Sequence, residues 1–216
     1  AANAGHSEAA YRAVSLYLRG HAADDEASAA LTALHKAAEL GHPESEALLG
    51  WCYQQGRGVP QSDDQALRWY DRAAAGGSAP GRFNLAMCLL RGFGGRTDLI
   101  EAIALLELAA EQGYPRAQLN LGRAFAEGKL VARDPAAAFY WYSQAAERGY
   151  AKAQYNLGLL LAGGDVADHD DAAAAEWIRA AAEQGLNKAQ FTLASLYRRG
   201  LGVARDPHAA MHWLEQ

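Results

Sequence analysis

The stretch GYPRAQLNLGRAFAEGKLVARDPAAAFYWYSQAAERG, residues 113–149, holds the pattern that decides the fold. Pro115 is favoured in the first turn of a helix, and Gly128 is typical of the position just after a helix ends. Asp134 and Pro135 form a second start signal, because an N-cap carboxylate accepts backbone N–H bonds and proline suits the first helical position. The stretch therefore predicts two helices joined by a short loop.

This helical hairpin recurs along the whole chain with a period of 36 residues and no insertion. One glycine ladder ends the second helices and is formed by Gly5, Gly41, Gly77, Gly113, Gly149 and Gly185. Another ends the first helices and is formed by Gly20, Gly56, Gly92, Gly128, Gly164 and Gly200. A large, mostly aromatic residue recurs in the second helix as Trp69, Leu105, Trp141, Trp177 and Trp213. One hairpin cannot bury its apolar faces alone, so neighbouring units stack and share a continuous core. The sequence predicts an all-α solenoid of six units near 5–40, 41–76, 77–112, 113–148, 149–184 and 185–216, which together form a single domain over residues 1–216.

The combined pattern resembles the Sel-one-like repeat family, a relative of tetratricopeptide repeats with a longer, glycine-containing loop. The residues that carry the resemblance are Ala153, Asn156, Leu157, Gly158, Gly200, Gly202, Val203, Asp206, Ala210 and Trp213. Unit one departs from the pattern most, with Val14 in place of the helix glycine, Ala22 in place of the loop glycine and Ala33 in place of the tryptophan. The resemblance implies a bacterial protein that folds as a right-handed α/α superhelix. It also implies that the protein binds other proteins and has no catalytic activity.

Composition and charge narrow the classes of function. The chain has 216 residues and a net charge of -5, which argues against nucleic-acid binding because that usually needs a basic surface. No run of about 18 apolar residues is present, so no membrane-spanning helix is expected. Cys52 and Cys88 lie 36 residues apart, at equivalent positions of successive units. Stacked helices lie about 8–10 Å apart and a disulfide needs Cα atoms within about 7 Å, so we expect two buried free thiols.

One polar stripe follows the first helix of every unit. In unit four Arg116, Asn120, Arg123 and Glu127 stand at i, i+4, i+7 and i+11, which places them on one helix face. Over the six units this register holds eight basic and three acidic residues, a net charge of +5 on a chain of net charge -5. A basic surface on an acidic protein produces an electric field that attracts acidic partners to that surface. We call these positions the first-helix stripe and expect it to line a concave groove, as the resemblance suggests.

The stripe supplies the candidate partner-binding residues, and two interpretations of it stay open. These residues are Trp51, Gln55, Asn84, Met87, Arg91, Arg116, Asn120, Arg123, Lys152, Asn156, Lys188 and Arg199. The basic side chains either bind an acidic protein segment or are simply solvated. The recurring asparagines either bond the backbone of a bound peptide or bond a neighbouring helix, and the second role is favoured since a residue shared by several repeats usually serves the repeat. Trp51 and Met87 would form an apolar anchor.

No catalytic, cofactor or metal site is expected. His208 and His212 have an i, i+4 spacing that can hold a metal, but no third ligand follows in a known motif. The acidic run at Asp168–Asp171 falls where a second helix begins, so helix capping explains it better than phosphohydrolase chemistry.

The leading hypothesis for function is a scaffold or adaptor that holds a partner protein or peptide. An inhibitor or immunity protein that neutralises a bacterial effector enzyme is one alternative, and an accessory module of a larger envelope or signalling protein is another. We expect a monomer, or weak self-association through the exposed solenoid ends. The resemblance admits both periplasm and cytoplasm, and we favour the periplasm. Because Ala1 and Ala2 match the last turn of a second helix, we expect the chain to be part of a longer array.

Overall fold

The computed structural model describes residues 24–164 and 170–216, and within those residues it contains helices and loops but no strand. This confirms the predicted all-α repeat fold, whereas the handedness of the superhelix stays a prediction. The chain divides into two compact units, Ala1–Gln112 and Gly113–Gln216, and each is described by itself. The boundary between the two compact units falls between two repeats. The expectation that the six repeats form a single domain stays a prediction. Ladder and stripe residues before Asp24, and Asp168, lie outside the described residues.

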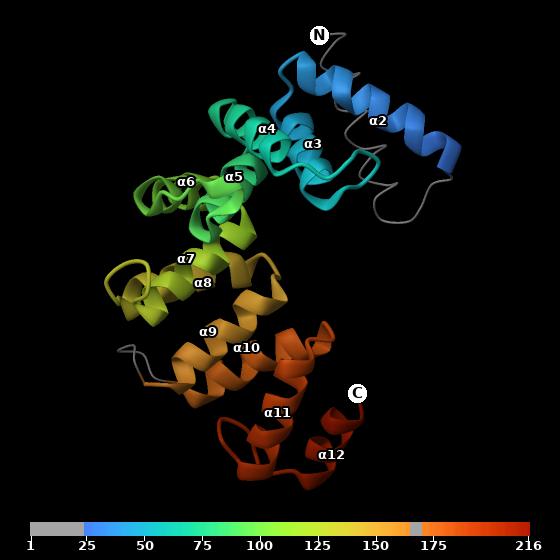
Figure 1. The fold of residues 1–216 in the computed structure, drawn as a ribbon. Coiled ribbons are helices and arrows are strands. Elements are labelled where there is room, and N and C mark those ends of the chain that lie inside the picture. Colours follow the sequence, from blue (N-terminus) through green and yellow to red (C-terminus); the bar gives the residue numbers. More distant parts are fainter. Residues whose placement is uncertain (1–23, 165–169) are drawn as a thin grey trace. The chain divides into compact units, whose positions relative to one another are not determined.

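In the first unit the helices pack in sequence order, each against the next, as Figure 1 shows. They are α2 (Asp24–Glu39), α3 (Pro43–Gln55), α4 (Asp63–Ala75), α5 (Ala79–Arg91) and α6 (Leu99–Glu111), with a short 3-10 turn η1 (Phe93–Gly95) before α6. The two first helices α3 and α5 also contact each other. Successive hairpins are thus layers of one stack.

In the second unit the helices also pack in sequence order, each against the next (Figure 1). Its helices are α7 (Pro115–Glu127), α8 (Pro135–Glu147), α9 (Ala151–Ala162), α10 (Asp171–Glu183), α11 (Asn187–Arg199) and α12 (Pro207–Glu215). Each hairpin packs along its length, and each second helix also contacts the first helix of the next repeat.

The helix ends form by the capping predicted from the sequence. The Asp134 carboxylate accepts hydrogen bonds from the backbone N–H groups of Ala136 and Ala137, each at 3.0 Å. Asp170 and Asp206 cap their helices in the same way, and Asp98 accepts one such bond, from the N–H of Glu101. Gly128 follows α7 with φ +67°, a left-handed conformation that residues with a Cβ adopt only at a cost.

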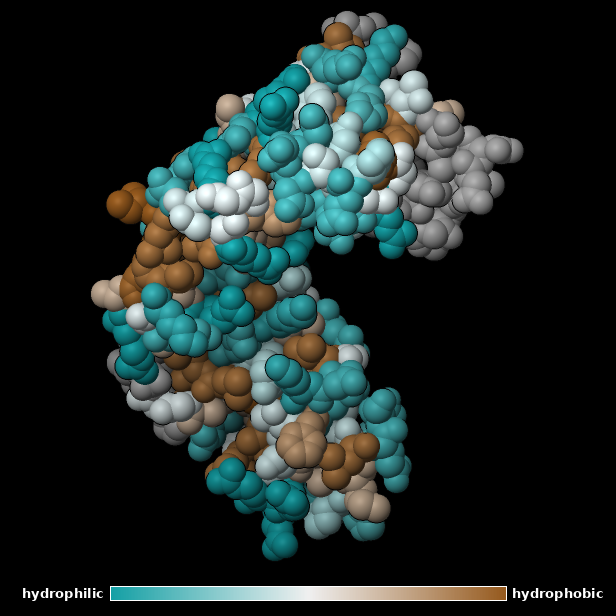
Figure 2. All heavy atoms as spheres, viewed as in Figure 1, coloured by the Kyte–Doolittle hydropathy of each residue, from teal (hydrophilic) through white to brown (hydrophobic). Residues whose placement is uncertain are grey.

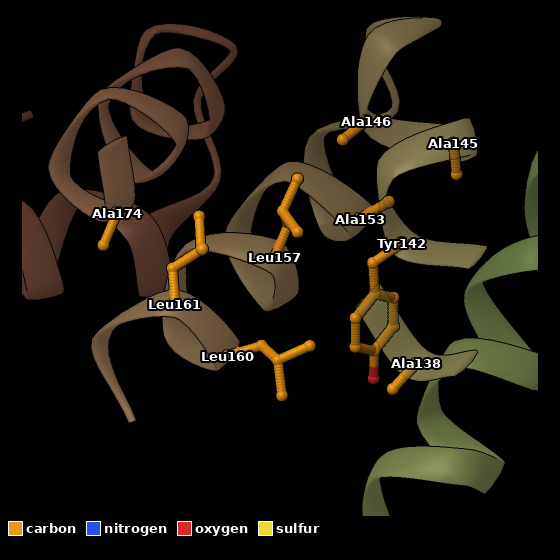
Figure 3. Close-up of a cluster of buried hydrophobic side chains, with 9 residues drawn as sticks. All are labelled: Ala138, Tyr142, Ala145, Ala146, Ala153, Leu157, Leu160, Leu161 and Ala174. Carbon is orange, nitrogen blue, oxygen red and sulfur yellow. The ribbon is translucent and has the colours of Figure 1, made fainter. Parts of the chain in front are cut away.

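Small side chains fill the core between repeats. In the second unit one buried cluster joins α8, α9 and α10, and Figure 3 shows its alanines beside Leu157, Leu160, Leu161 and Tyr142. The alanine pairs in the last turns of the second helices, such as Ala145–Ala146 and Ala181–Ala182, are almost fully buried. Alanine there lets helices approach closely, which explains why the pair recurs with the repeat.

The glycine within a first helix makes room for one large side chain. A Cβ added to Gly122 would lie 2.5 Å from Cδ1 of Tyr142, and one added to Gly50 would lie 2.8 Å from Cδ1 of Tyr70. Repeat three has Ala86 at the glycine position and Leu106 at the tyrosine position. Where the first helix has alanine in place of glycine, the facing residue on the second helix is thus the smaller leucine in place of tyrosine.

In the second unit a glutamine from the next repeat bonds the end of the second helices α8 and α10. Gln154 Nε2 donates to the Ala146 carbonyl at 3.2 Å, and Gln190 Nε2 donates to the Ala182 carbonyl at 3.5 Å. Each of these carbonyls also accepts from the backbone N–H of the glycine that follows the helix, so the glutamine supplies a further hydrogen bond to an oxygen with two lone pairs.

Glu46 occupies the corresponding position in repeat two, where a carboxylate cannot donate this bond. Arg72 takes over the task, since it donates to the Ala38 carbonyl at 3.0 Å and pairs with Glu46 at 2.8 Å. Its guanidinium also lies over the Trp69 ring, 4.6 Å from the centroid. Burial of Glu46 nevertheless raises the pKa of its carboxyl above the ordinary value, although the charge and hydrogen bond of Arg72 act in the opposite direction.

Candidate partner-binding surface

In the second unit the first-helix stripe is a solvent-facing row of side chains on α7, α9 and α11. The helix spacing brings these positions to one face, because the neighbouring faces carry buried residues such as Leu121, Leu157 and Leu193. The exposed basic members are Arg116, Arg123, Lys152, Lys188 and Arg199. The amides of Asn120 and Asn156 and the hydroxyls of Thr192 and Ser195 are half-buried between them.

Charges on α7 are partly compensated. Glu127 accepts from Lys129 at 2.9 Å and lies 4.0 Å from Arg123 one turn earlier. The hydrogen bond from Lys129 lowers the pKa of the Glu127 carboxyl. Further along, Lys152, Lys188 and Arg199 have no ion-pair partner among the residues that the structure describes. In the second unit the stripe therefore carries positive charge on α9 and α11 without an ion-paired carboxylate among the described residues.

The asparagines of the stripe bond groups of the protein itself. Asn156 is hydrogen-bonded to the hydroxyl of Tyr142 on the preceding second helix, while burial raises the pKa of this tyrosine to about 12. Asn120 has Leu106 at the equivalent position, which offers no hydroxyl, and its Nδ2 donates to the Arg116 carbonyl at 2.7 Å instead. The Asn156 contact joins two helices, as the structural interpretation expects, whereas Asn120 bonds a carbonyl of its own helix, and its role stays a prediction.

A hydroxyl pair joins Tyr155 on α9 to the stripe residue Thr192 on α11. The hydroxyl oxygens of Tyr155 and Thr192 lie 3.3 Å apart, and Thr192 donates to the Lys188 carbonyl at 2.8 Å. Because the Thr192 hydroxyl hydrogen is used in that bond, Tyr155 donates to Thr192 and links α9 to α11.

In the first unit the stripe is less exposed. Gln55 and Arg91 are exposed, whereas Asn84, Met87 and Trp51 are half-buried. Trp51 packs against the core cluster of Leu34, Ala38, Leu49 and Cys52. Part of its ring therefore serves packing, and its role as an anchor stays a prediction.

Leu159 on α9 is an apolar stripe residue that is 42% exposed between the basic positions. It belongs to the first-helix stripe by register but is not one of the candidate partner-binding residues. Leu159 stands at the helix position equivalent to Arg123 and Ser195, and this position is the sequence signal for a stripe residue.

The two cysteines are free and buried, as predicted. Burial raises the pKa of both thiols to about 11, so the reactive thiolate is scarce at neutral pH. The Cys88 sulfur accepts a hydrogen bond from Gln54 Nε2 at 3.7 Å, which ties it to the preceding repeat.

Among the described side chains, those of residues 29–164 and 170–216, no group of three or more His, Cys, Asp or Glu residues could hold a metal ion. His208 and His212 lie exposed on α12, and the His212 ring contacts Trp213 edge to face. No described helix has the length and apolar character needed to cross a membrane.

The Sel1 repeat model matches the chain over residues 7–42, 43–78, 79–114, 115–150, 151–186 and 187–216. The matched repeats have the period predicted from the sequence and begin two residues later than the units proposed above. Among curated proteins none matches the sequence.

Two solved bacterial structures are similar over nearly the whole chain. One is c5321, a protective antigen of uropathogenic Escherichia coli that displays an SLR fold, with 34% identity, a TM-score of 0.84 and coverage of 98% of this chain. The other is a Sel1 repeat protein from Oxalobacter formigenes, with 30% identity, a TM-score of 0.81 and coverage of 94% of this chain and 79% of that one. The match to c5321 spans 44% of that protein's length.

The immunity protein PA5088 from Pseudomonas aeruginosa is a more distant structural neighbour. It shares 24% identity at a TM-score of 0.59, over 96% of this chain and 74% of that one. At this identity the likeness shows the fold alone.

Proposed function

Since the chain belongs to the Sel1 repeat family, we propose that it is a scaffold or adaptor that binds an acidic segment of a partner protein along the first-helix stripe of its second unit. The observation that carries the proposal is the set of exposed side chains Lys152, Lys188 and Arg199, which share one helix register and have no ion-pair partner within the described part of the chain.

The proposed mechanism is reversible binding to a preorganised surface. Hydrogen bonds such as that between Asn156 and Tyr142 hold the helices in place before a partner arrives, so little conformational entropy is lost on binding. The basic side chains steer an acidic partner and fix its register. Leu159 offers a central apolar contact of the kind that often supplies binding energy.

A pair of charge-matched variants tests the proposal. In the first, Lys152→Glu is combined with Lys188→Glu on the stripe. In the second, Arg133→Glu is combined with Arg205→Glu, two exposed loop positions of the same unit. Both variants change the net charge equally, so a general electrostatic effect acts on both.

The measurement is quantitative mass spectrometry of proteins captured from the source organism by the wild-type chain and by each variant. We expect a partner that is lost with the stripe variant and retained with the loop variant. Equal retention by both variants would refute the proposal. A captured enzyme whose activity disappears on binding would favour the inhibitor alternative instead.

A further inference from the structure

The second helix of repeat three has an unusually apolar outer face. On α6 Ile100 is 83% exposed, and Leu99 and Leu108 are also exposed, as is Ala104. We call these four residues the α6 outer face. Ile100, Ala104 and Leu108 follow each other at intervals of four, so they form one stripe. Figure 2 shows hydrophobic surface where Figure 1 places α6.

The repeat does not require these apolar residues, because the same positions on other second helices differ. On α4 the equivalents of Ile100, Ala104 and Leu108 are Asp64, Arg68 and Arg72, all exposed. On α10 they are Ala172, Glu176 and Ala180, with Glu176 exposed. The outer position faces solvent in each of these helices, so the aliphatic residues of α6 are not core residues. Contiguous exposed apolar residues mark interaction sites.

The charges of α6 are distributed unevenly along it. Near its start Glu101 is neutralised by Arg96 at 2.8 Å. Towards its end Glu107 and Glu111 are exposed and have no ion-pair partner within the described residues. The α6 outer face is therefore apolar near the start of the helix and flanked by the acidic residues Glu107 and Glu111 near its end.

A second copy of the chain does not complement this surface. Parallel pairing about a two-fold axis would bring Glu107 and Glu111 close to the same residues of the other copy. Antiparallel pairing about Ala104 would place Glu107 against the apolar end near Ile100. Both arrangements bury acidic groups without a counter-charge, which is costly.

We propose that the α6 outer face docks a helix of a partner protein that is apolar at one end and carries basic residues at the other. The apolar end covers Leu99, Ile100 and Ala104, and the basic end pairs with Glu107 and Glu111 around Leu108. This site lies on a second helix of the first unit, separate from the first-helix stripe, so it does not depend on the function proposed above.

Fluorescence anisotropy with defined peptide probes tests the proposal on the full chain. The probe is a fluorescein-labelled helical peptide with leucines at i, i+4 spacing in one half and lysines in the other. The matched probe has glutamates in place of the lysines. We expect saturable binding of the lysine probe, and about tenfold weaker binding to the Ile100→Lys variant, the loss typical of one removed anchor.

Charge variants complete the experiment. Glu107→Lys should weaken the lysine probe and strengthen the glutamate probe, because the complementary charge has changed sign. Glu176→Lys makes the same change at the outer position of α10 and should leave binding unaltered. Equal binding to the wild type and to Ile100→Lys, or no saturable binding of the lysine probe, would overturn the proposal. So would sedimentation that shows a dimer lost in Ile100→Lys, since the occupant would then be a second copy.

Discussion

Replacing Gly122 by alanine tests whether this glycine is present to accommodate the Tyr142 ring. The new Cβ would lie 2.5 Å from Cδ1 and 2.6 Å from Cε1 of a tyrosine that is only 4% exposed. The ring has no free space to enter, and overpacking of this kind costs about 1–3 kcal/mol. Alanine also favours the helix by about 1 kcal/mol relative to glycine. We therefore expect a net loss of up to about 2 kcal/mol of unfolding free energy.

A double-mutant cycle with Tyr142→Leu separates these two effects. The double variant reproduces the Ala86 and Leu106 pair of repeat three, in which alanine and leucine already occur together. In the leucine background the clash is absent, so Gly122→Ala should stabilise the protein by about 1 kcal/mol. The coupling free energy between the two sites should then be about 1–3 kcal/mol.

Urea unfolding followed by far-UV circular dichroism gives the four free energies. Ala104→Gly, at an exposed position within α6, serves as the control for helix propensity alone and should cost about 1 kcal/mol. If Gly122→Ala has the same effect whether residue 142 is tyrosine or leucine, the steric explanation is wrong.

Three further predictions concern the cap, the buried carboxylate and the thiols. Asp134→Ala should lower the free energy of urea unfolding by about 1 kcal/mol, because two backbone N–H groups lose their acceptor, while Asp134→Ser should retain most of it. The pKa of the Glu46 carboxyl is higher in the folded protein than its ordinary value of 4.5. Ionisation of this carboxyl therefore lowers the free energy of unfolding as the pH rises above 4.5. Glu46→Gln should therefore gain stability relative to wild type between about pH 4 and pH 7, measured as the difference in urea midpoints. With pKa values of about 11 instead of 9.0, Cys52 and Cys88 should react with iodoacetamide at pH 8 about a hundredfold more slowly than in urea, as mass spectrometry can follow.

Much of the fold could be predicted because the repeat signals are local. Pro115 and Gly128 predict the start and end of a helix, and α7 occupies Pro115–Glu127. Asp134 predicts a cap and accepts the expected hydrogen bonds. Such signals depend on a few neighbouring residues and on backbone geometry that each residue type prefers, so they can be recognised without the tertiary structure.

The interior could be predicted only in part. A large aromatic residue that recurs in every second helix favours a core position, but Trp69, Trp141, Trp177 and Trp213 are half-buried. The fully buried position is the next residue, occupied by Tyr70, Leu106, Tyr142 and Ile178. Both positions recur every 36 residues, so periodicity alone cannot separate them. Burial depends on where the neighbouring repeat crosses the helix.

The candidate binding surface shows the same division. The helical period by itself determined that Arg123, Lys152, Lys188 and Arg199 are exposed, because spacing places them opposite the apolar flanks. Only the tertiary structure decided that Asn156 bonds Tyr142, since this bond joins two different repeats. The sequence determined the repeat, its helices and their caps, because these depend on local backbone preferences. Packing between repeats decided which side chains remain available to a partner, because burial and bonding there depend on residues far apart in the chain.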